Sequence, residues 1–150
     1  GPLQPMNIAI ASDHAAVELK AELEQWLRAE GHLVEDLGPA TADRVDYPDY
    51  GYKLATAVAS GAADRGIALC GSGIGISIAV NRNRACRCAL VGEPLSAALS
   101  REHNDANVLA MGARLTGVDM AKACVTAFLT TEFGGGRHAG RVDKLSQPAL

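Results

Sequence analysis

The sequence predicts an α/β fold in which helices cover both faces of a parallel sheet. Short apolar segments alternate five times with longer amphipathic segments along the 150 residues, as in repeated strand-helix units. Hydrophobic residues make up 48% of the chain and charged residues 21%, an ordinary globular composition. Aromatic residues make up only 4% and there are 16 glycines, so we expect helices to pack closely on the sheet.

The expected strands are short apolar runs bounded by Gly, Asp, Asn or Pro. They cover residues 7–12, 33–36, 66–70, 85–91 and 108–111. The expected helices cover residues 15–30, 49–60, 74–80, 94–103 and 118–130. The first helix has the clearest pattern, because Leu19, Leu23 and Leu27 fall on one stripe. Gly31 is expected to end it.

Both ends of the chain differ from this pattern. Residues 1–5 look like a remnant of an expression tag before Met6, and residues 6–150 are expected to form one domain. A flexible Gly-Gly-Gly break at residues 134–136 precedes a polar tail. We expect the tail, residues 137–150, to form a short helix and a loose end.

Charge and hydropathy exclude several classes of protein. The net charge is −3 and no basic run is interleaved with aromatic residues, so nucleic acid is not an expected partner. No apolar stretch approaches the roughly 20 residues of a membrane span, and no signal peptide opens the chain, so we expect no membrane partner and a cytoplasmic protein. The four cysteines form no C-x-x-C pair, which argues against a metal site or a disulfide scaffold. Cys86, Cys88 and Cys124 are expected to be buried thiols.

The most informative segment is Cys-Gly-Ser-Gly-Ile-Gly-Ile-Ser at residues 70–77. It follows the third expected strand, and ligands of open parallel sheets bind beyond the carboxyl ends of strands. Its glycines let several backbone N–H groups converge on one point, which suits an anion or a developing oxyanion. The spacing does not match the dinucleotide loop, the phosphate loop of NTPases or the G-x-S-x-G nucleophile elbow.

Cys70 lies at the mouth of this turn, where the helix dipole and backbone donors favour a thiolate. It is therefore a candidate base or nucleophile. The alternative is a buried cysteine at a strand end, beside a turn that needs glycine for its geometry alone. The spacing by itself does not separate these two interpretations.

Polar residues at other strand and helix ends are further candidates. His103 and Asn104 close the fourth expected helix, where a histidine is as often only a favourable end charge. Asp13 follows the first strand and is also a natural N-cap for the first helix.

Arginines near the C-terminus are candidates for binding an anion. Arg137 and Arg141 are four residues apart, so in a helix they share a face and suit a phosphate dianion. A basic pair at such a position is more often a solvated surface. Arg114, at the end of the fifth expected strand, is a third candidate.

Together these segments resemble type B ribose-5-phosphate isomerases, which are grouped with the galactose-6-phosphate and allose-6-phosphate isomerases. The resemblance runs from Asn7 to about Leu145. Its carriers are Ser-Asp-His at residues 12–14, Asp-Tyr-Pro at 46–48, the glycine-rich segment at 70–77, Glu-Pro at 93–94, Ser-Arg-Glu-His-Asn-Asp at 100–105 and Gly-Gly-Arg-His-Ala-Gly-Arg at 135–141. Several independent segments in the same order are more specific than any one of them.

The resemblance implies a Rossmann-like three-layer α/β/α sandwich around a five-stranded parallel sheet. It implies a homodimer whose subunits share active sites, with a tetramer as the alternative, and no metal or organic cofactor. Its substrate would be a phosphorylated sugar. The leading expectation is interconversion of ribose 5-phosphate and ribulose 5-phosphate. Erythrose 4-phosphate, allose 6-phosphate and galactose 6-phosphate are alternative substrates, and a non-catalytic sugar-phosphate-binding protein is an alternative function.

The resemblance also implies catalytic roles. Cys70 would remove the C2 proton to give a cis-enediolate, and Ser72 would shuttle hydroxyl protons. His103, with Asp13 nearby, would open the furanose ring. The backbone amides of the glycine-rich turn, among them those of Gly71, Gly73 and Gly75, would stabilise the enediolate.

The remaining roles concern substrate binding. Arg137 and Arg141 would hold the phosphate, so the tail of the domain would be a phosphate-binding tail. Arg114 and His14 would also contact the phosphate. Tyr47, Asn104 and Asp13 would bind the sugar.

Two departures from the family pattern are present. Some relatives use a glutamate base on the following helix turn, and the equivalent position here is Ile76, which cannot accept a proton. The base assignment therefore falls on Cys70. Residues 81–88 are also richer in Arg and Cys than the family pattern, which bears on local strand packing or a subunit contact.

Overall fold

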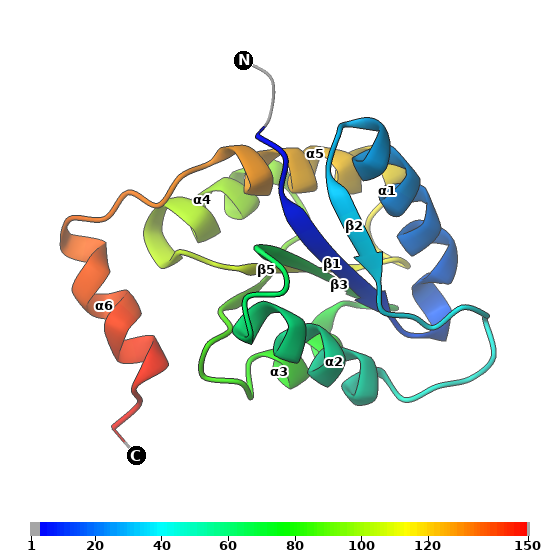
Figure 1. The fold of residues 1–150 in the computed structure, drawn as a ribbon, viewed down its shortest axis with the longest axis horizontal. Coiled ribbons are helices and arrows are strands. Elements are labelled where there is room, and N and C mark those ends of the chain that lie inside the picture. The colour runs from blue at the N-terminus through cyan, green and yellow to red at the C-terminus, as the bar shows by residue number, and fades with distance from the viewer. Residues whose placement is uncertain (1–3, 150) are drawn as a thin grey trace.

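The computed structural model describes residues 4–149 and contains one five-stranded, all-parallel sheet (Figure 1). The first three residues of the expected tag remnant, and residue 150 of the expected loose end, lie outside this range. The strand order is β2-β1-β3-β5-β4. The strands are β1 (Asn7–Ser12), β2 (Leu33–Asp36), β3 (Arg65–Cys70), β4 (Cys88–Leu90) and β5 (Val108–Gly112). The predicted α/β class is confirmed.

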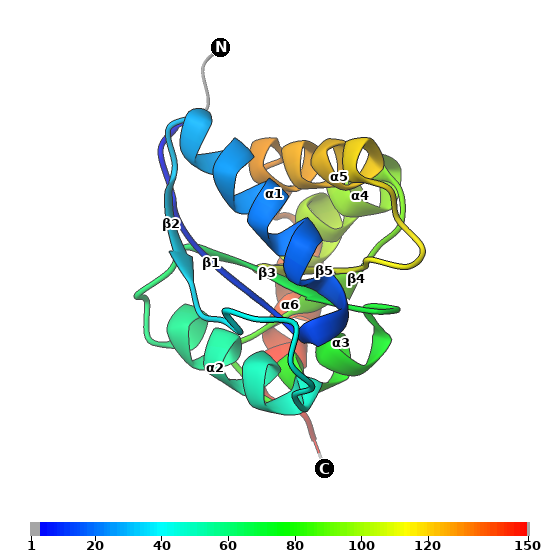
Figure 2. The same cartoon turned by 90° about the vertical axis from the view of Figure 1, so that its right-hand side faces the viewer.

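Helices cover both faces of the sheet (Figure 2). One face carries α1 (Val17–Ala29), α4 (Pro94–Asn104) and α5 (Val118–Thr130), and the other carries α2 (Tyr47–Ala59) and α3 (Ile74–Val80). The last helix, α6 (Arg137–Ser146), projects from the body on an extended segment after α5 (Figure 1). The three layers agree with the expected Rossmann-like sandwich.

The alternation of side chains along each strand separates two hydrophobic cores. In β1, Ile8 and Ile10 point into the core beneath α1, α4 and α5, whereas Ala9 and Ala11 point toward α2 and α3. In β3 the same alternation directs Leu69 to the first core and Cys70 to the second. The small side chains on the second face leave room for close packing of α2 and α3. Cys70 therefore lies on the α2–α3 side of the sheet.

The fourth strand is shorter than predicted. Strand β4 covers Cys88–Leu90 instead of residues 85–91. Asparagine side chains satisfy the backbone before it: Asn83 Oδ1 accepts from Ala85 N at 3.0 Å, and Asn107 Oδ1 accepts from Arg87 N at 2.7 Å. Because these groups already have partners, the ladder begins only at Cys88.

Two helix starts also differ from the prediction. The first helix is preceded by a 3₁₀ turn, η1 (His14–Ala16), in which Asp13 Oδ1 accepts from Ala15 N at 2.9 Å. Asp13 therefore caps this 3₁₀ turn, whereas the N-cap of α1 itself is Ala16, which has no side-chain cap. The predicted helix end at Gly31 is confirmed, and φ there is +97°. Helix α2 begins two residues early, at Tyr47, because Pro48 fits the first turn of a helix.

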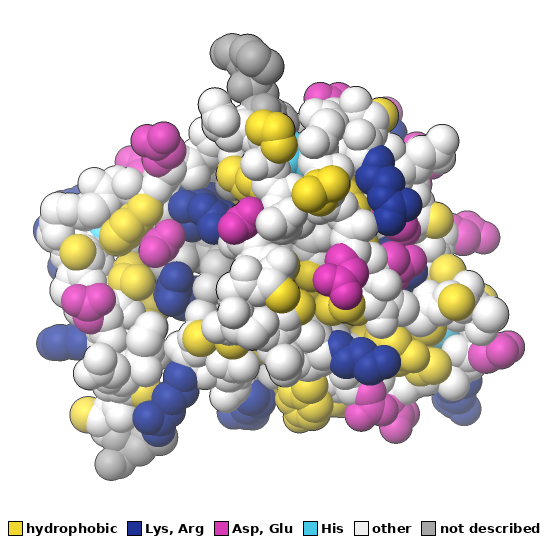
Figure 3. Space-filling view, in the orientation of Figure 1, with side chains coloured by type: hydrophobic (Ala, Val, Ile, Leu, Met, Phe, Trp, Pro, Cys, Tyr) yellow, Lys and Arg dark blue, Asp and Glu magenta, His cyan; other side chains and the backbone are white. Residues whose placement is uncertain are grey.

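Between residues 4 and 149, no helix is both long and apolar enough to cross a membrane. Acidic and basic side chains are interspersed over the face seen in Figure 3, so this face carries mixed charge.

Candidate active site

A cleft of about 580 Å³ opens at the carboxyl ends of β1, β3 and β5. This is the edge where ligands of open parallel sheets bind, and the volume is within the usual range for small-molecule sites. The cleft is lined by residues that the sequence predicted and by three apolar side chains, those of Ile74, Ile78 and Leu115. The lining residues are Asp13, Tyr47, Cys70, Gly71, Ser72, Ile74, Gly75, Ile78, Arg114 and Leu115.

The Cys70 sulfur lies inside the glycine-rich turn. Gly73 N donates to Cys70 Sγ at 3.1 Å, so a backbone N–H group of the turn points at the sulfur. Gly73 has φ +79°, in the left-handed region that glycine adopts without strain. A Cβ at this position would lie 2.7 Å from the backbone carbon of Met111, so β5 also leaves no space for a side chain.

The same turn directs backbone N–H groups toward the side chains of Cys70 and Ser72. The first backbone N–H groups of a helix have no acceptor within the helix. At α3, Gly73 N donates to the Cys70 sulfur and Ile74 N donates to Ser72 Oγ at 3.2 Å. The amides of Gly75 and Ile76 follow in the first turn of α3. The turn can therefore stabilise negative charge on the sulfur and on a neighbouring oxygen.

Asp13 and His14 are fixed by contacts to the backbone. Asp13 lines the cleft beside Cys70, with its Oδ1 held by Ala15 N. Val45 N donates to His14 Nδ1 at 3.1 Å, and the Val45 carbonyl oxygen lies 3.2 Å from the same nitrogen. The loop before α2 therefore sets the orientation of the imidazole ring.

Tyr47 and Arg114 lie against glycines of the turn. A Cβ at Gly75 would lie 2.6 Å from Cζ of Tyr47, and one at Gly71 would lie 3.4 Å from Cζ of Arg114. The absence of a side chain at Gly75 thus makes room for the phenol ring, whereas a Cβ at Gly71 would be in ordinary van der Waals contact with the guanidinium. Arg114 N donates to the carbonyl of Gly71 at 3.0 Å, which fixes the base of that side chain.

A second cluster of predicted residues lies between α4 and α6. His103 and His138 stack with ring centroids 4.6 Å apart and planes inclined by 19°. Together with Asn104, Arg141, Val142 and Leu145 they line a second cleft of about 330 Å³. The pKa of His138 is lowered, chiefly by desolvation and to a smaller extent by the charges of His103, Arg137 and Arg141. Arg137 is the first residue of α6 and is exposed.

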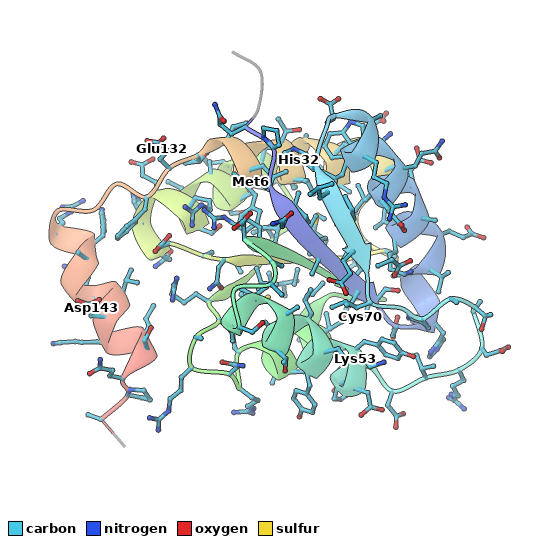
Figure 4. The ribbon with its side chains drawn as sticks, in the orientation of Figure 1. Met6, His32, Lys53, Cys70, Glu132 and Asp143 are labelled. Atoms are coloured by element: carbon cyan, nitrogen blue, oxygen red, sulfur yellow. The ribbon has the colours of Figure 1, made fainter. Side chains whose placement is uncertain are left out.

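The sheet separates the two clusters within one chain. Cys70 ends β3 at the carboxyl edge and faces α2 and α3, whereas α4 packs on the opposite face. Helix α4 also runs back toward the amino edge, so His103 lies shortly before β5 begins at Val108. In Figure 4, Cys70 and Asp143 of α6 are likewise well apart. The Cys70 cleft thus holds Asp13, Tyr47, Ser72 and Arg114, while His103, Asn104, Arg137 and Arg141 lie elsewhere.

The other cysteines differ from Cys70 in their surroundings. Cys86 and Cys124 are buried, as predicted, and Cys88 is only partly buried. Burial raises the pKa of Cys86 and of Cys124, which favours neutral thiols. Across residues 4–149, no three His, Cys, Asp or Glu side chains cluster as metal ligands do.

Sequence reasoning missed several residues of these clusters. Ile78 and Leu115 line the Cys70 cleft, and both are exposed although they are large and apolar. Ile78 follows Ile74 by one helical turn, and this spacing was the available signal. His138 belongs to the motif at residues 135–141, but the resemblance assigns it no role. Its stacking on His103 depends on how α6 packs against α4, which the sequence pattern does not specify.

Comparison with known proteins gives one consistent result. The family model described as Ribose/Galactose Isomerase matches residues 8–145. Ribose-5-phosphate isomerase B of Escherichia coli (strain K12) is 45% identical over 93% of this chain and 94% of its own length. A ribose-5-phosphate isomerase B structure from Clostridium thermocellum superposes with a TM-score of 0.93 at 48% identity, covering 95% and 96% of the two chains. D-erythrulose-4-phosphate isomerase of Pectobacterium atrosepticum is 40% identical over 93% of both chains.

Proposed function

The chain belongs to the ribose/galactose isomerase family, and we propose that it interconverts ribose 5-phosphate and ribulose 5-phosphate with Cys70 as the base. It is a sugar-phosphate isomerase of the aldose-ketose type. The observation that carries the proposal is the Gly73 N–H contact to Cys70 Sγ, at the mouth of a cleft that also contains Asp13 and Arg114. The ribose-5-phosphate relatives support the choice of a five-carbon substrate.

Proton transfer between C1 and C2 is the central step. The Cys70 thiolate removes the proton from C2 of the open-chain aldose, and the electron pair forms a C1–C2 double bond while the C1 oxygen becomes anionic. This oxygen and the C2 oxygen lie cis in the enediolate, where the amides of residues 71–75 stabilise the charge. Ser72 carries a proton from the C2 hydroxyl to the C1 oxygen. The Cys70 thiol then returns its proton to C1, which gives the ketose and restores the thiolate.

We propose that a second copy of the chain completes the site. Within one chain Cys70 faces α2 and α3, whereas α4, which carries His103, packs on the opposite face of the sheet. This separation supports a site that is shared between two subunits. In a homodimer, His103, Asn104, Arg137 and Arg141 of one subunit would meet the Cys70 cleft of the other. Exposed apolar side chains support such an interface: Ile74 and Ile78 flank the cleft, and Leu145 lies beside the second cluster.

Each residue from the second copy has a physical role. His103 would exchange protons with the ring oxygen and the C1 hydroxyl, which opens the furanose, with Asp13 nearby. Arg137 and Arg141 project from one face of α6 and would bind the phosphate together with Arg114 and His14. This grip fixes C2 against the sulfur, and such positioning is a large part of catalysis. Tyr47 and Asn104 would orient the sugar.

A substrate panel tests the reaction. Ribose 5-phosphate, erythrose 4-phosphate, allose 6-phosphate and galactose 6-phosphate are compared by kcat/KM, and ribose 5-phosphate is expected to be turned over fastest. A higher value for another sugar would replace the substrate but keep the reaction class. Binding of all four without turnover would make the protein a non-catalytic sugar-phosphate binder.

Mixing two inactive variants tests the shared site. Cys70→Ala and His103→Ala are refolded together in equal amounts. Half of the resulting dimers are mixed, and each mixed dimer has one site with both residues intact, so about one quarter of wild-type activity should return. A site built within one chain would recover no activity. Each variant refolded alone is the control.

A further inference from the structure

Helix α4 ends in a backbone conformation that is uncommon for residues other than glycine. Asp105 has φ +48° and ψ +43°, in the left-handed region, and among residues 4–149 it is the one non-glycine residue with positive φ. In this region the Cβ of an L-residue crowds the backbone, so the conformation is less favourable than a right-handed one. Asp105 directly follows His103 and Asn104, the last two residues of α4, and its conformation ends the helix beside them.

The carboxylate of Asp105 is held by a buried arginine. Arg101 is only 4% exposed, and its Nη1 donates to Asp105 Oδ1 at 2.7 Å and to the Ala106 carbonyl at 2.8 Å. Charge-assisted hydrogen bonds of this kind are stronger than neutral ones. The guanidinium thus offsets the backbone cost at Asp105 and fixes the end of α4.

The same guanidinium also holds the segment that leads to α6. Arg101 Nε donates to the carbonyl of Thr131, which follows the last residue of α5, at 3.1 Å. Next to this contact, Gly134 N donates to the carbonyl of Glu102 at 2.9 Å. The extended connection from α5 to α6 is therefore tied to α4 beside His103.

From these contacts we propose that Arg101 is a positioning residue, which sets His103 and Asn104 on α4 and the arginines of α6 in one fixed arrangement. The inference rests on the proposed function, because it concerns the half of the site that a second copy would receive. Arg101 does not line either cleft. It acts through the residues that it holds and does not touch the substrate.

The fork shape of the side chain is necessary for this role. One guanidinium directs Nε to Thr131 and Nη1 to Asp105 and Ala106. A lysine carries the same charge at a single nitrogen, which cannot reach acceptors on both sides. Arg101→Lys therefore keeps the buried charge and releases one of the two segments.

A neighbouring arginine supplies a matched control. Arg87 also contacts Asp105, with Nε donating to its carbonyl at 2.8 Å and Nη2 lying 3.5 Å from Oδ2. It belongs to the loop before β4, and the contacts that hold Thr131 and Gly134 come from Arg101 and Glu102 instead. Arg87→Met removes contacts to the same aspartate and leaves the Arg101–Thr131 contact in place.

Three measurements on Arg101→Lys, Arg101→Met and Arg87→Met test the proposal. Thermal unfolding gives the loss of stability, steady-state kinetics with ribose 5-phosphate gives kcat and KM, and NMR follows the titration of His138. Displacement of catalytic groups by about 1 Å costs about 10²-fold in rate. Both Arg101 variants should lose about that factor in kcat/KM, with lower kcat and higher KM, and Arg87→Met should stay within about threefold.

The titration of His138 gives a readout that does not depend on turnover. In the wild type its pKa is lowered by desolvation and by the neighbouring cations. If His138 no longer stacks on His103, the pKa of His138 should rise toward its ordinary value. We expect this rise in both Arg101 variants and not in Arg87→Met. This result would support the positioning role even if the wild-type protein failed to isomerise ribose 5-phosphate.

The Arg101→Lys variant can also overturn the proposal. If Arg101→Lys folds with a lower Tm, yet keeps wild-type kcat, KM and His138 titration, Arg101 is only a structural residue and the proposal is wrong. If Arg101→Met does not fold, Arg101→Lys decides the question, because it retains the charge next to Asp105.

Discussion

The phenol ring of Tyr47 occupies the space that a side chain at Gly75 would need. A Cβ at Gly75 would lie 2.6 Å from Cζ of Tyr47 and 2.9 Å from its Cδ1, closer than real contacts. The first turn of α2 therefore packs directly on the first turn of α3 at the edge of the Cys70 cleft. Glycine at this position serves the packing of the site in addition to its backbone donor.

We expect Gly75→Ala to be a stable variant with impaired turnover. Alanine favours a helix over glycine by roughly 0.5–1 kcal/mol, but its methyl group must displace Tyr47 from the cleft. The expected result is a fall in kcat/KM of about 10-fold or more, since misplaced groups lose catalysis steeply. Steady-state kinetics and thermal unfolding measure the two effects.

Two controls separate the clash from other effects of this substitution. Gly92 has no neighbour within 4 Å of its Cβ position, so Gly92→Ala should leave kcat/KM unchanged. In a Tyr47→Ala background the clash is absent, and Gly75→Ala should then add no further loss. A further loss in that background would show that contact with Tyr47 is not the reason.

Replacement of Cys70 by alanine is expected to remove turnover and keep binding. Loss of a general base costs about 10²–10⁴-fold in rate, while a phosphorylated inhibitor should still bind because the anion-binding groups remain. Calorimetry with the inhibitor and an aldose-ketose assay test the two statements. Cys124→Ala is the matched control, since that thiol is fully buried in the core on the other face. Unchanged turnover in Cys70→Ala would eliminate Cys70 as the base.

Truncation of Arg141 is expected to act on substrate binding. A hydrogen bond to a charged group contributes about 1.5–3 kcal/mol, so Arg141→Ala should raise KM by roughly 10- to 100-fold and change kcat less. Arg28→Ala, an arginine on α1, serves as the control. If KM stays at the wild-type value, this face of α6 is a solvated surface and does not hold phosphate.

The role proposed for His103 can be tested by changing the substrate. Ribose 5-phosphate closes a furanose ring through its O4, whereas erythrose 4-phosphate carries its phosphate on O4 and cannot close that ring. His103→Ala should therefore lose more kcat/KM with ribose 5-phosphate than with erythrose 4-phosphate. Equal losses on both sugars would count against a ring-opening role.

Stability in acid should depend on the cap of α4. Glu93 accepts from Leu95 N at 2.6 Å and from Ser96 N at 2.8 Å. Hydrogen bonding by Ser96, and by the Leu95 N–H, lowers the pKa of Glu93. Because the folded pKa lies below the unfolded one, the stabilisation is present above the unfolded value of about 4.3 and is lost as the pH falls through the folded pKa.

Glu93→Gln tests this dependence. The variant should have a lower Tm than the wild type at pH 7, and the difference should shrink as the pH falls below about 4. Thermal unfolding followed by circular dichroism between pH 3 and pH 7 measures both curves. A difference in Tm that is constant over this range would mean that the carboxylate charge is not what stabilises the helix start.

Local pattern was sufficient to predict most of the fold. Strands β1 and β2 and helices α3 and α5 have the predicted bounds, because apolar periodicity and glycine or aspartate boundaries act within a few residues. The prediction was wrong at β4, where Asn83 and Asn107 bind the backbone of residues 85–87. Asn107 lies about twenty residues farther along the chain, so no local window contains that contact.

By itself the sequence determined the α/β class, the family and the chemistry of the residues, because these follow from periodicity and from motifs whose members are close in the chain. The tertiary structure decided which of those residues meet. Cys70 joins Asp13, Tyr47 and Arg114 at one edge, while α4 carries His103 to the other face and toward the other edge of the sheet. The face on which each crossover helix packs depends on how all five strands bury their side chains together, and short-range sequence patterns do not contain that information.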